Sequence, residues 1–175
     1  PTSEDTDALV ITITSPTVNE NAGTVTFTAT VTGGTSDADI TFDYITADDS
    51  ALAASDYTAL VSATATITAG NTTADIVVTL TDDTVSEQTE QFFLNLSNLE
   101  KSGATACEDT VYSSAATLPG TATIEDTDAL VITIKSPTVN ENACTVTFTA
   151  TGTGGTPDAD IPFEKITAHD RSLVA

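Results

Sequence analysis

Acidic residues are concentrated in one short stretch of the chain, Asp82–Phe93. Its sequence, DDTVSEQTEQFF, carries four carboxylates within nine residues, at Asp82, Asp83, Glu87 and Glu90, and contains no basic residue. Carboxylates at such spacing repel one another unless water solvates them or they share a cation. Calcium takes about six to eight oxygen ligands, whereas magnesium favours a smaller octahedron that keeps waters. The stretch is a candidate cation site if other loops bring further acids to it.

The charge and composition of the whole chain exclude several classes of function. The 175 residues carry 26 acids and four bases, for a net charge of −22. This charge repels nucleic acid and anionic membranes. We expect no direct membrane insertion, since no apolar run approaches membrane-spanning length. Cys107 and Cys144 form no CxxC pattern, which argues against zinc. No nucleophile pairs with the single histidine, His169, in a recognisable motif, so we expect no enzyme.

Alternating apolar and polar residues, rich in Thr, Val and Ile, predict an all-β fold. The predicted strands are 9–14, 24–32, 40–47, 60–68, 72–81, 90–97 and 120–126. Seven such strands separated by turns predict an antiparallel two-sheet sandwich of the immunoglobulin-like type.

The order of these strands predicts where the acids gather. If consecutive strands reverse direction, the connections after the first, third and fifth strands lie at one end, together with the segment after the seventh. These connections hold Glu20, Asp48, Asp49, Asp82, Asp83, Glu87, Glu90, Glu125, Asp126 and Asp128, and we call this end of the sandwich the acidic end. Turn chemistry alone explains one acidic turn. Acids from four converging loops instead favour a shared cation.

An internal repeat defines the domain organisation. Residues 5–50 recur at 126–171 with an offset of 121, and 37 of the 46 aligned positions are identical. The period has the size of one β-sandwich domain. We expect residues 1–7 to end a preceding module or linker, 8–128 to form a complete module, and 129–175 to begin a second, incomplete one. Either a continuing chain or another chain would supply the missing strands, and the sequence leaves both open.

Five separated segments resemble the Calx-beta domain, a β-sandwich module of sodium–calcium exchanger regulatory regions, some integrin tails and large bacterial surface proteins. They are NENAGTVTFTA (19–29), YITADDSALAASDY (44–57), ITAGNTTADIVVTLTDD (67–83), VSEQTEQFFLNLSN (85–98) and TATIEDTD (121–128). The resemblance implies a seven-stranded sandwich that binds Ca²⁺. It also implies ligands at Glu20, Asp48, Asp82, Asp83, Glu87, Glu90, Asp126 and Asp128.

The chain departs from the family pattern in the closing triplet and at two positions of the loop after residue 48. Thr127 stands where the triplet usually has its middle acid, and Glu125 precedes the triplet. Asp49 and Ala54 stand where the family usually has glycine. Within the same loop we expect structural roles for Asp56, as a turn or cap residue, and for Tyr57, as a core residue.

The leading hypothesis is a non-enzymatic, calcium-binding repeat module of a long extracellular or cell-surface protein, with a structural or adhesive role. Calcium would stiffen joints between modules, because Asp126 and Asp128 lie in the linker. Partners would be neighbouring modules of the same chain, with homotypic strand exchange or filament assembly as a variant. Near-identical copies and a Thr-rich, Lys-poor composition favour this hypothesis. The alternatives are a regulatory calcium-sensor domain of a membrane transporter and an accessory module of a secreted enzyme.

Overall fold

The computed structural model describes two units of the chain, which are treated separately below. The described residues are 9–102 and 118–165; the first unit comprises residues 1–83 and 88–127, and the second residues 84–87 and 128–175. The expected linker at 1–7, Cys107 and His169 lie outside the described residues. Within the described ranges, no helix is long and apolar enough to cross a membrane.

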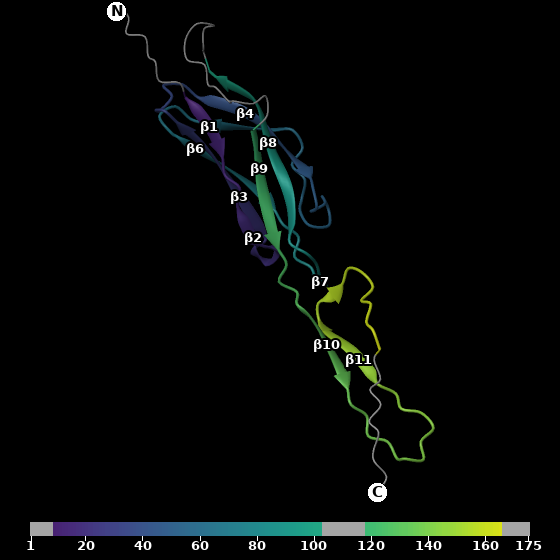
Figure 1. Ribbon diagram of the computed structural model, residues 1–175. Coiled ribbons are helices and arrows are strands. Elements are labelled where there is room, and N and C mark those ends of the chain that lie inside the picture. Colours follow the sequence, from purple (N-terminus) through teal and green to yellow (C-terminus); the bar gives the residue numbers. More distant parts are fainter. Residues whose placement is uncertain (1–8, 103–117, 166–175) are drawn as a thin grey trace, which may run out of the picture. The chain divides into compact units, whose positions relative to one another are not determined.

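The first unit is an all-β sandwich of two sheets (Figure 1). One sheet has the order β1-β3-β6, with β1 at Val10–Ile13, β3 at Thr24–Thr32 and β6 at Thr73–Thr79. The other has the order β2-β9-β8-β4-β5, with β2 at Thr17–Asn19, β9 at Leu118–Glu125, β8 at Glu90–Lys101, β4 at Ile40–Asp48 and β5 at Ala63–Ile67. All neighbouring strands are antiparallel except β2 and β9, which are parallel.

The start of the first unit differs from the sequence-based prediction. The predicted strand 9–14 is followed by a second, short strand, β2, in the opposite sheet, so the two sheets contain three and five strands instead of seven in total. The chain changes sheets at Pro16, which has no N–H to continue the ladder of β1. The carbonyl of Pro16 instead accepts a hydrogen bond from the Thr123 N–H at 2.9 Å, in the sheet that β2 joins.

The core lies between the two sheets and is built around three aromatic side chains. Phe27 of β3 and Phe92 of β8 are fully buried, and Tyr57 from the loop after β4 is 1% exposed. The Tyr57 ring stacks on Phe92 with centroids 4.1 Å apart, and Phe27 meets Phe92 edge-on at 5.9 Å. Every second residue of β3 and β8 faces this core, as the period of a strand requires.

Strand directions bring the acidic connections to one end, as the alternation predicts. β4 and β9 are both antiparallel to β8, and β2 is parallel to β9, so the carboxyl ends of β2, β4 and β9 coincide. The carboxyl end of β6 joins them, because the Leu80 N–H donates to the carbonyl of Gly23 at 3.0 Å.

The loop from Asp49 to Ser62 holds two non-glycine residues with positive φ, Ala54 and Ser62, and the first of them shapes the turn before Tyr57. Ala54 has φ of +78°, in the left-handed region. Its N–H donates to the Tyr57 carbonyl at 2.8 Å, so the tight turn that presents Tyr57 to the core depends on this conformation. The glycine usual in the family at this position would adopt it without steric cost.

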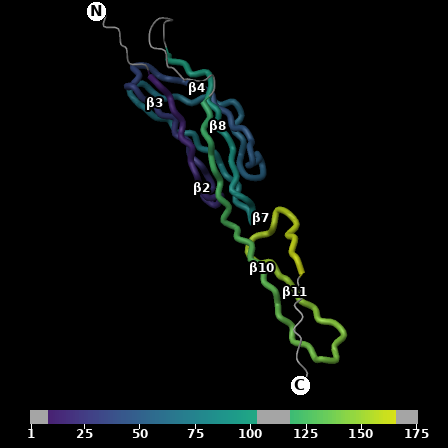
Figure 2. The backbone as a smooth tube through the Cα atoms, in the orientation of Figure 1, coloured from purple at the N-terminus to yellow at the C-terminus, as the bar shows by residue number. Residues whose placement is uncertain are grey.

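The second unit contains two strand pairs. β10 (Leu130–Lys135) pairs antiparallel with β11 (Thr149–Gly154), and β7 (Val85–Ser86) pairs parallel with β12 (Thr156–Pro157). Figure 2 shows the long loop that joins β10 to β11. Val131 lies opposite Thr153, and 121 residues earlier Val10 lies opposite Thr32, so the two copies share their strand register.

β11 begins later than its counterpart in the first unit. β3 begins at Thr24, whereas β11 begins at Thr149, the position equivalent to Thr28. Residues 24–27 of β3 pair only with β6, and the described residues of the second unit include no strand equivalent to β6. The shorter strand therefore reflects a missing partner, because the sequence 145–151 is identical to 24–30.

Replacing Phe92 by alanine should destabilise the first unit by about 3–5 kcal/mol, because the substitution removes the ring between Phe27 and Tyr57 and leaves a cavity. Phe93, the next residue of the same strand, is half-buried and serves as the matched control. Urea unfolding measures both variants. Equal losses of stability in Phe92→Ala and Phe93→Ala would contradict this account of the core.

Replacing Ala54 by glycine should stabilise the protein by about 1 kcal/mol, because glycine relieves the left-handed strain. The control is Ala53→Gly, next to it and outside the left-handed region, which should destabilise through added freedom of the unfolded chain. Thermal unfolding followed by circular dichroism compares the two. A loss of stability in Ala54→Gly would refute the assignment of backbone strain to Ala54.

Candidate metal centre

The end of β2 places a carboxylate inside the acidic end. After Asn19 the chain forms a short 3₁₀ helix, η1 (Glu20–Ala22), and Gly23 closes it with φ of +72° and an N–H that donates to the Glu20 carbonyl at 3.3 Å. This tight turn directs the Glu20 side chain inward, where it is only 4% exposed. A buried carboxylate needs partners, because burial disfavours its charged form.

Thr127, just after β9, supplies hydrogen bonds to Glu20. Its N–H donates to Glu20 Oε1 at 3.0 Å, and its hydroxyl lies 3.2 Å from the same oxygen. The pKa of Glu20 is nevertheless raised, first by burial and then by the neighbouring carboxyl of Asp126, which outweigh the bonds from Thr127. In the absence of a cation, the charged form of Glu20 is therefore less favourable at this position than it is in water.

Glu20 and Asp82 can offer oxygens to a single ion. One carboxylate oxygen of each lies within 4.8 Å of the other. Calcium binds oxygens at about 2.3–2.6 Å, so two ligands of one ion lie at most about 5 Å apart. Glu20 follows β2 of the five-stranded sheet and Asp82 follows β6 of the three-stranded sheet. An ion held by both would connect the ends of the two sheets.

A second carboxylate pair lies in the first unit, between Asp56 and Glu90. Their oxygens also approach within 4.8 Å. Asp56 comes from the loop after β4, and its carbonyl accepts a hydrogen bond from the Thr81 N–H at 2.9 Å, which fixes this loop to the end of β6. Glu90 opens β8 and lies opposite Ile124 of β9. The pair therefore brings together segments that the sequence separates by more than thirty residues.

Asp56 has the structural role expected from the sequence and a further capacity that the sequence analysis did not assign. Its Oδ2 accepts the Leu52 N–H at 2.6 Å, which confirms the turn role, and Tyr57 is confirmed as a core residue. The missed signal is the position of Asp56 as the third acid of the loop that also holds Asp48 and Asp49.

Asp48 holds the loop after β4 in place. Its Oδ1 accepts the Tyr57 hydroxyl at 2.6 Å and the Ala53 N–H at 2.9 Å. These two bonds, the Tyr57 bond first, lower the pKa of Asp48. Burial, together with Asp48, raises the pKa of Tyr57 to about 12. Oδ1 of Asp48, an expected ligand, is thus already used as a hydrogen-bond acceptor within the loop.

The remaining expected ligands are distributed over both units. Asp126 lies beside Glu20, as its effect on the pKa of Glu20 shows. Asp83 is exposed and is the last residue of the first unit before residues 84–87, which belong to the second unit. It is part of neither carboxylate pair. Glu87 and Asp128 belong to the second unit, so their roles as ligands remain sequence predictions.

Comparison with known proteins identifies the family. The sequence profile of the Calx-beta domain matches residues 4–129. A comparison with curated proteins gave no significant match.

Solved structures of Calx domains share the fold of this chain. The apo form of the Calx CBD1 domain is 23% identical with a TM-score of 0.55, and the match covers 69% of this chain and 99% of that domain. The CBD12 structure of CALX1.2 is 22% identical with a TM-score of 0.54, and the match covers 67% of this chain and 45% of that one. The Calx CBD2 domain is 10% identical with a TM-score of 0.56, and the match covers 67% of this chain and 86% of that domain.

The comparisons correct the expected location. The expectation of an extracellular or cell-surface protein is wrong, because the solved structures compared with this chain are Calx CBD domains.

Calx-beta domains bind Ca²⁺, and the first unit has paired carboxylates at a spacing suited to that ion. Since the family profile matches more than half of the residues, the chain belongs to the Calx-beta family of calcium-binding domains.

Proposed function

We propose that the first unit is a regulatory calcium-binding module whose ion is held at the acidic end by Glu20 and Asp82, with Asp126 beside them. The pair formed by Asp56 and Glu90 offers a second position. The observation that carries the proposal is the buried carboxylate of Glu20, which lies next to Asp126 and within 4.8 Å of a carboxylate oxygen of Asp82. Bound calcium would supply the positive charge that this group lacks among its described neighbours.

Hard oxygen donors from separate loops suit calcium better than zinc or a redox metal. Glu20 contributes a carboxylate of which one oxygen, Oε1, already accepts the two hydrogen bonds from Thr127. Asp82 contributes an exposed one that can reorient. Of the other expected ligands in the first unit, Asp48 and Asp83 would join only if their loops adjust around the ion. Glu87 and Asp128 belong to the second unit and stay sequence predictions.

Calcium binding would act through the loops that carry these residues. The turn at Gly23 is bonded to Leu80, two residues before Asp82, and Asp56 is bonded to Thr81. Relief of carboxylate repulsion would therefore order three loops together, and it is this change that we propose as the regulatory signal. Neighbouring modules of the same polypeptide are the expected recipients of the signal. We propose no catalytic role.

The finer architecture is part of the same proposal. If β1 and β2 count as one strand interrupted at Pro16, the first unit has the seven-stranded pattern expected of the family. Residues 8–128 would then form one module of a tandem array with period 121, and residues from 129 onward would begin the next. The shared register of β1–β3 and β10–β11 supports this organisation.

The pH dependence of stability tests the state of Glu20. Because its folded-state pKa is raised from 4.5, the calcium-free protein gains stability when Glu20 is protonated, and it loses that gain as pH rises through the raised pKa. In EGTA, Glu20→Gln should lack this loss, since glutamine can still accept the Thr127 bonds. Urea unfolding between pH 4 and 8 should show that the free energy of unfolding of the variant rises relative to that of the wild type as pH increases. Glu100→Gln, an exposed acid on β8, is the control. A constant difference between Glu20→Gln and wild type across this range would argue against a strained carboxylate.

Isothermal titration with calcium tests the site itself. Glu20→Gln and Asp82→Asn should each weaken binding about tenfold or more, which corresponds to about 1.4 kcal/mol or more. Glu100→Gln, paired with Thr41 at the opposite end of the sandwich, should bind like wild type. Magnesium should bind more weakly than calcium, because the donors come from adjustable loops. Unchanged affinity in both site variants would exclude the proposed centre.

A further inference from the structure

Large apolar side chains are exposed in the second unit. Phe163 is 76% exposed, Phe148 is 63% exposed and Ile132 is 46% exposed. Soluble proteins seldom leave several apolar side chains of this size exposed in one small unit.

The internal repeat identifies these side chains as core residues. Shifted by 121 positions, Phe163, Phe148 and Ile132 correspond to Phe42, Phe27 and Ile11. Those three counterparts are fully buried or 1% exposed in the first unit. The same residue types are therefore buried in one copy and exposed in the other, although the paired strands of the two copies share their register.

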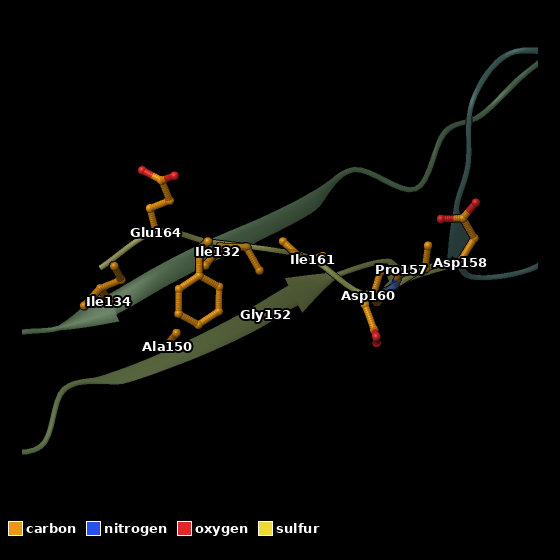
Figure 3. Close-up of a pocket in the computed structure, with 11 residues that line it drawn as sticks. Ile132, Ile134, Ala150, Gly152, Pro157, Asp158, Asp160, Ile161 and Glu164 are labelled. Atoms are coloured by element: carbon orange, nitrogen blue, oxygen red, sulfur yellow. The ribbon is translucent and has the colours of Figure 1, made fainter. Parts of the chain in front are cut away.

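The exposed face forms a groove of about 700 Å³ within the second unit. It is lined by Ile132 and Ile134 of β10, Ala150 and Gly152 of β11, and Ile161 and Phe163 of the following segment. Figure 3 shows the segment that carries Ile161 running along the side-chain face of the two strands. Gly152 stands at the position equivalent to Val31, and the loss of that side chain widens the groove.

The first unit shows what covers this face. The buried residues that complete its core come from β5, β6, β8 and β9: Ile67, Ile76, Val78, Phe92, Leu94, Leu96, Ala122 and Ile124. In addition, β6 pairs with the edge of β3 that is equivalent to one edge of β11. One segment thus supplies both a strand for the edge and an apolar face for the core.

We propose that the β10–β11 face is a docking surface for a polypeptide segment with the strand pattern of β5 to β9, as found in residues 63–125. Docking would add a β6-like strand to the edge of β11 and bury the groove beneath β8-like and β9-like strands, a form of strand complementation. An intact second copy of this chain does not provide that segment, because its own β5 to β9 already cover its β1, β3 and β4. The proposal does not depend on the calcium site.

The test adds the segment to the complete chain. Residue 171 aligns with residue 50, so residues 172–175 are replaced by a second copy of residues 51–127. Hydrogen exchange then follows the amides of 130–135 and 149–154, in calcium and in EGTA. We expect exchange at these amides to slow at least about tenfold relative to the 175-residue chain, because the ladder gains a partner and a covered face. Binding of a hydrophobic dye should fall in parallel.

Two variants of adjacent residues in β10 serve as matched probes of the face. Ile132→Asp in the extended chain should abolish the added protection, because Ile132 lines the groove. Val131→Asp should leave the protection in place, because its counterpart Val10 points away from the core and is 40% exposed. Equal effects of the two substitutions would overturn the assigned face.

Two other results would also overturn the proposal. One is unchanged exchange in the extended chain. The other is a dimer of the unextended chain, seen by sedimentation velocity, in which β10 and β11 are already protected, since the occupant would then be a second copy.

Discussion

Repulsion among carboxylates is the interaction on which the acidic end depends. Glu20 is buried beside Asp126, and Asp82 reaches the same place from the other sheet. The fold produces this arrangement through strand direction alone, because the carboxyl ends of β2, β4, β6 and β9 coincide. Thr127 offsets part of the cost with two hydrogen bonds, and the raised pKa of Glu20 shows that the compensation is incomplete.

The pattern of alternating residues was sufficient to predict the sandwich and the gathering of acids at one end. It could not predict that the chain changes sheets at Pro16, because local alternation reports which residues face a core and not which strand supplies the partner. It also could not show that Asp48 is bonded to Tyr57, or that Asp56 combines a turn role with a carboxylate facing Glu90. Those roles depend on contacts between loops.

Composition misled the prediction of location. A threonine-rich, lysine-poor composition describes strand propensity and charge, and neither property reports a compartment. The two copies of the repeat make a related point about burial. Phe27 and Phe148 are the same residue of the repeat, yet one is fully buried and the other is 63% exposed, because within the described part of the chain only Phe27 is covered by further strands.

The central claim, that a cation relieves the buried charge of Glu20, can be measured at that residue. A carboxyl ¹³C NMR titration should follow Glu20 with and without calcium. Without calcium the midpoint should lie above the ordinary pKa, as burial and Asp126 require. With calcium bound it should fall below the ordinary value, because the charged form becomes a ligand. The same midpoint in both titrations would contradict the claim.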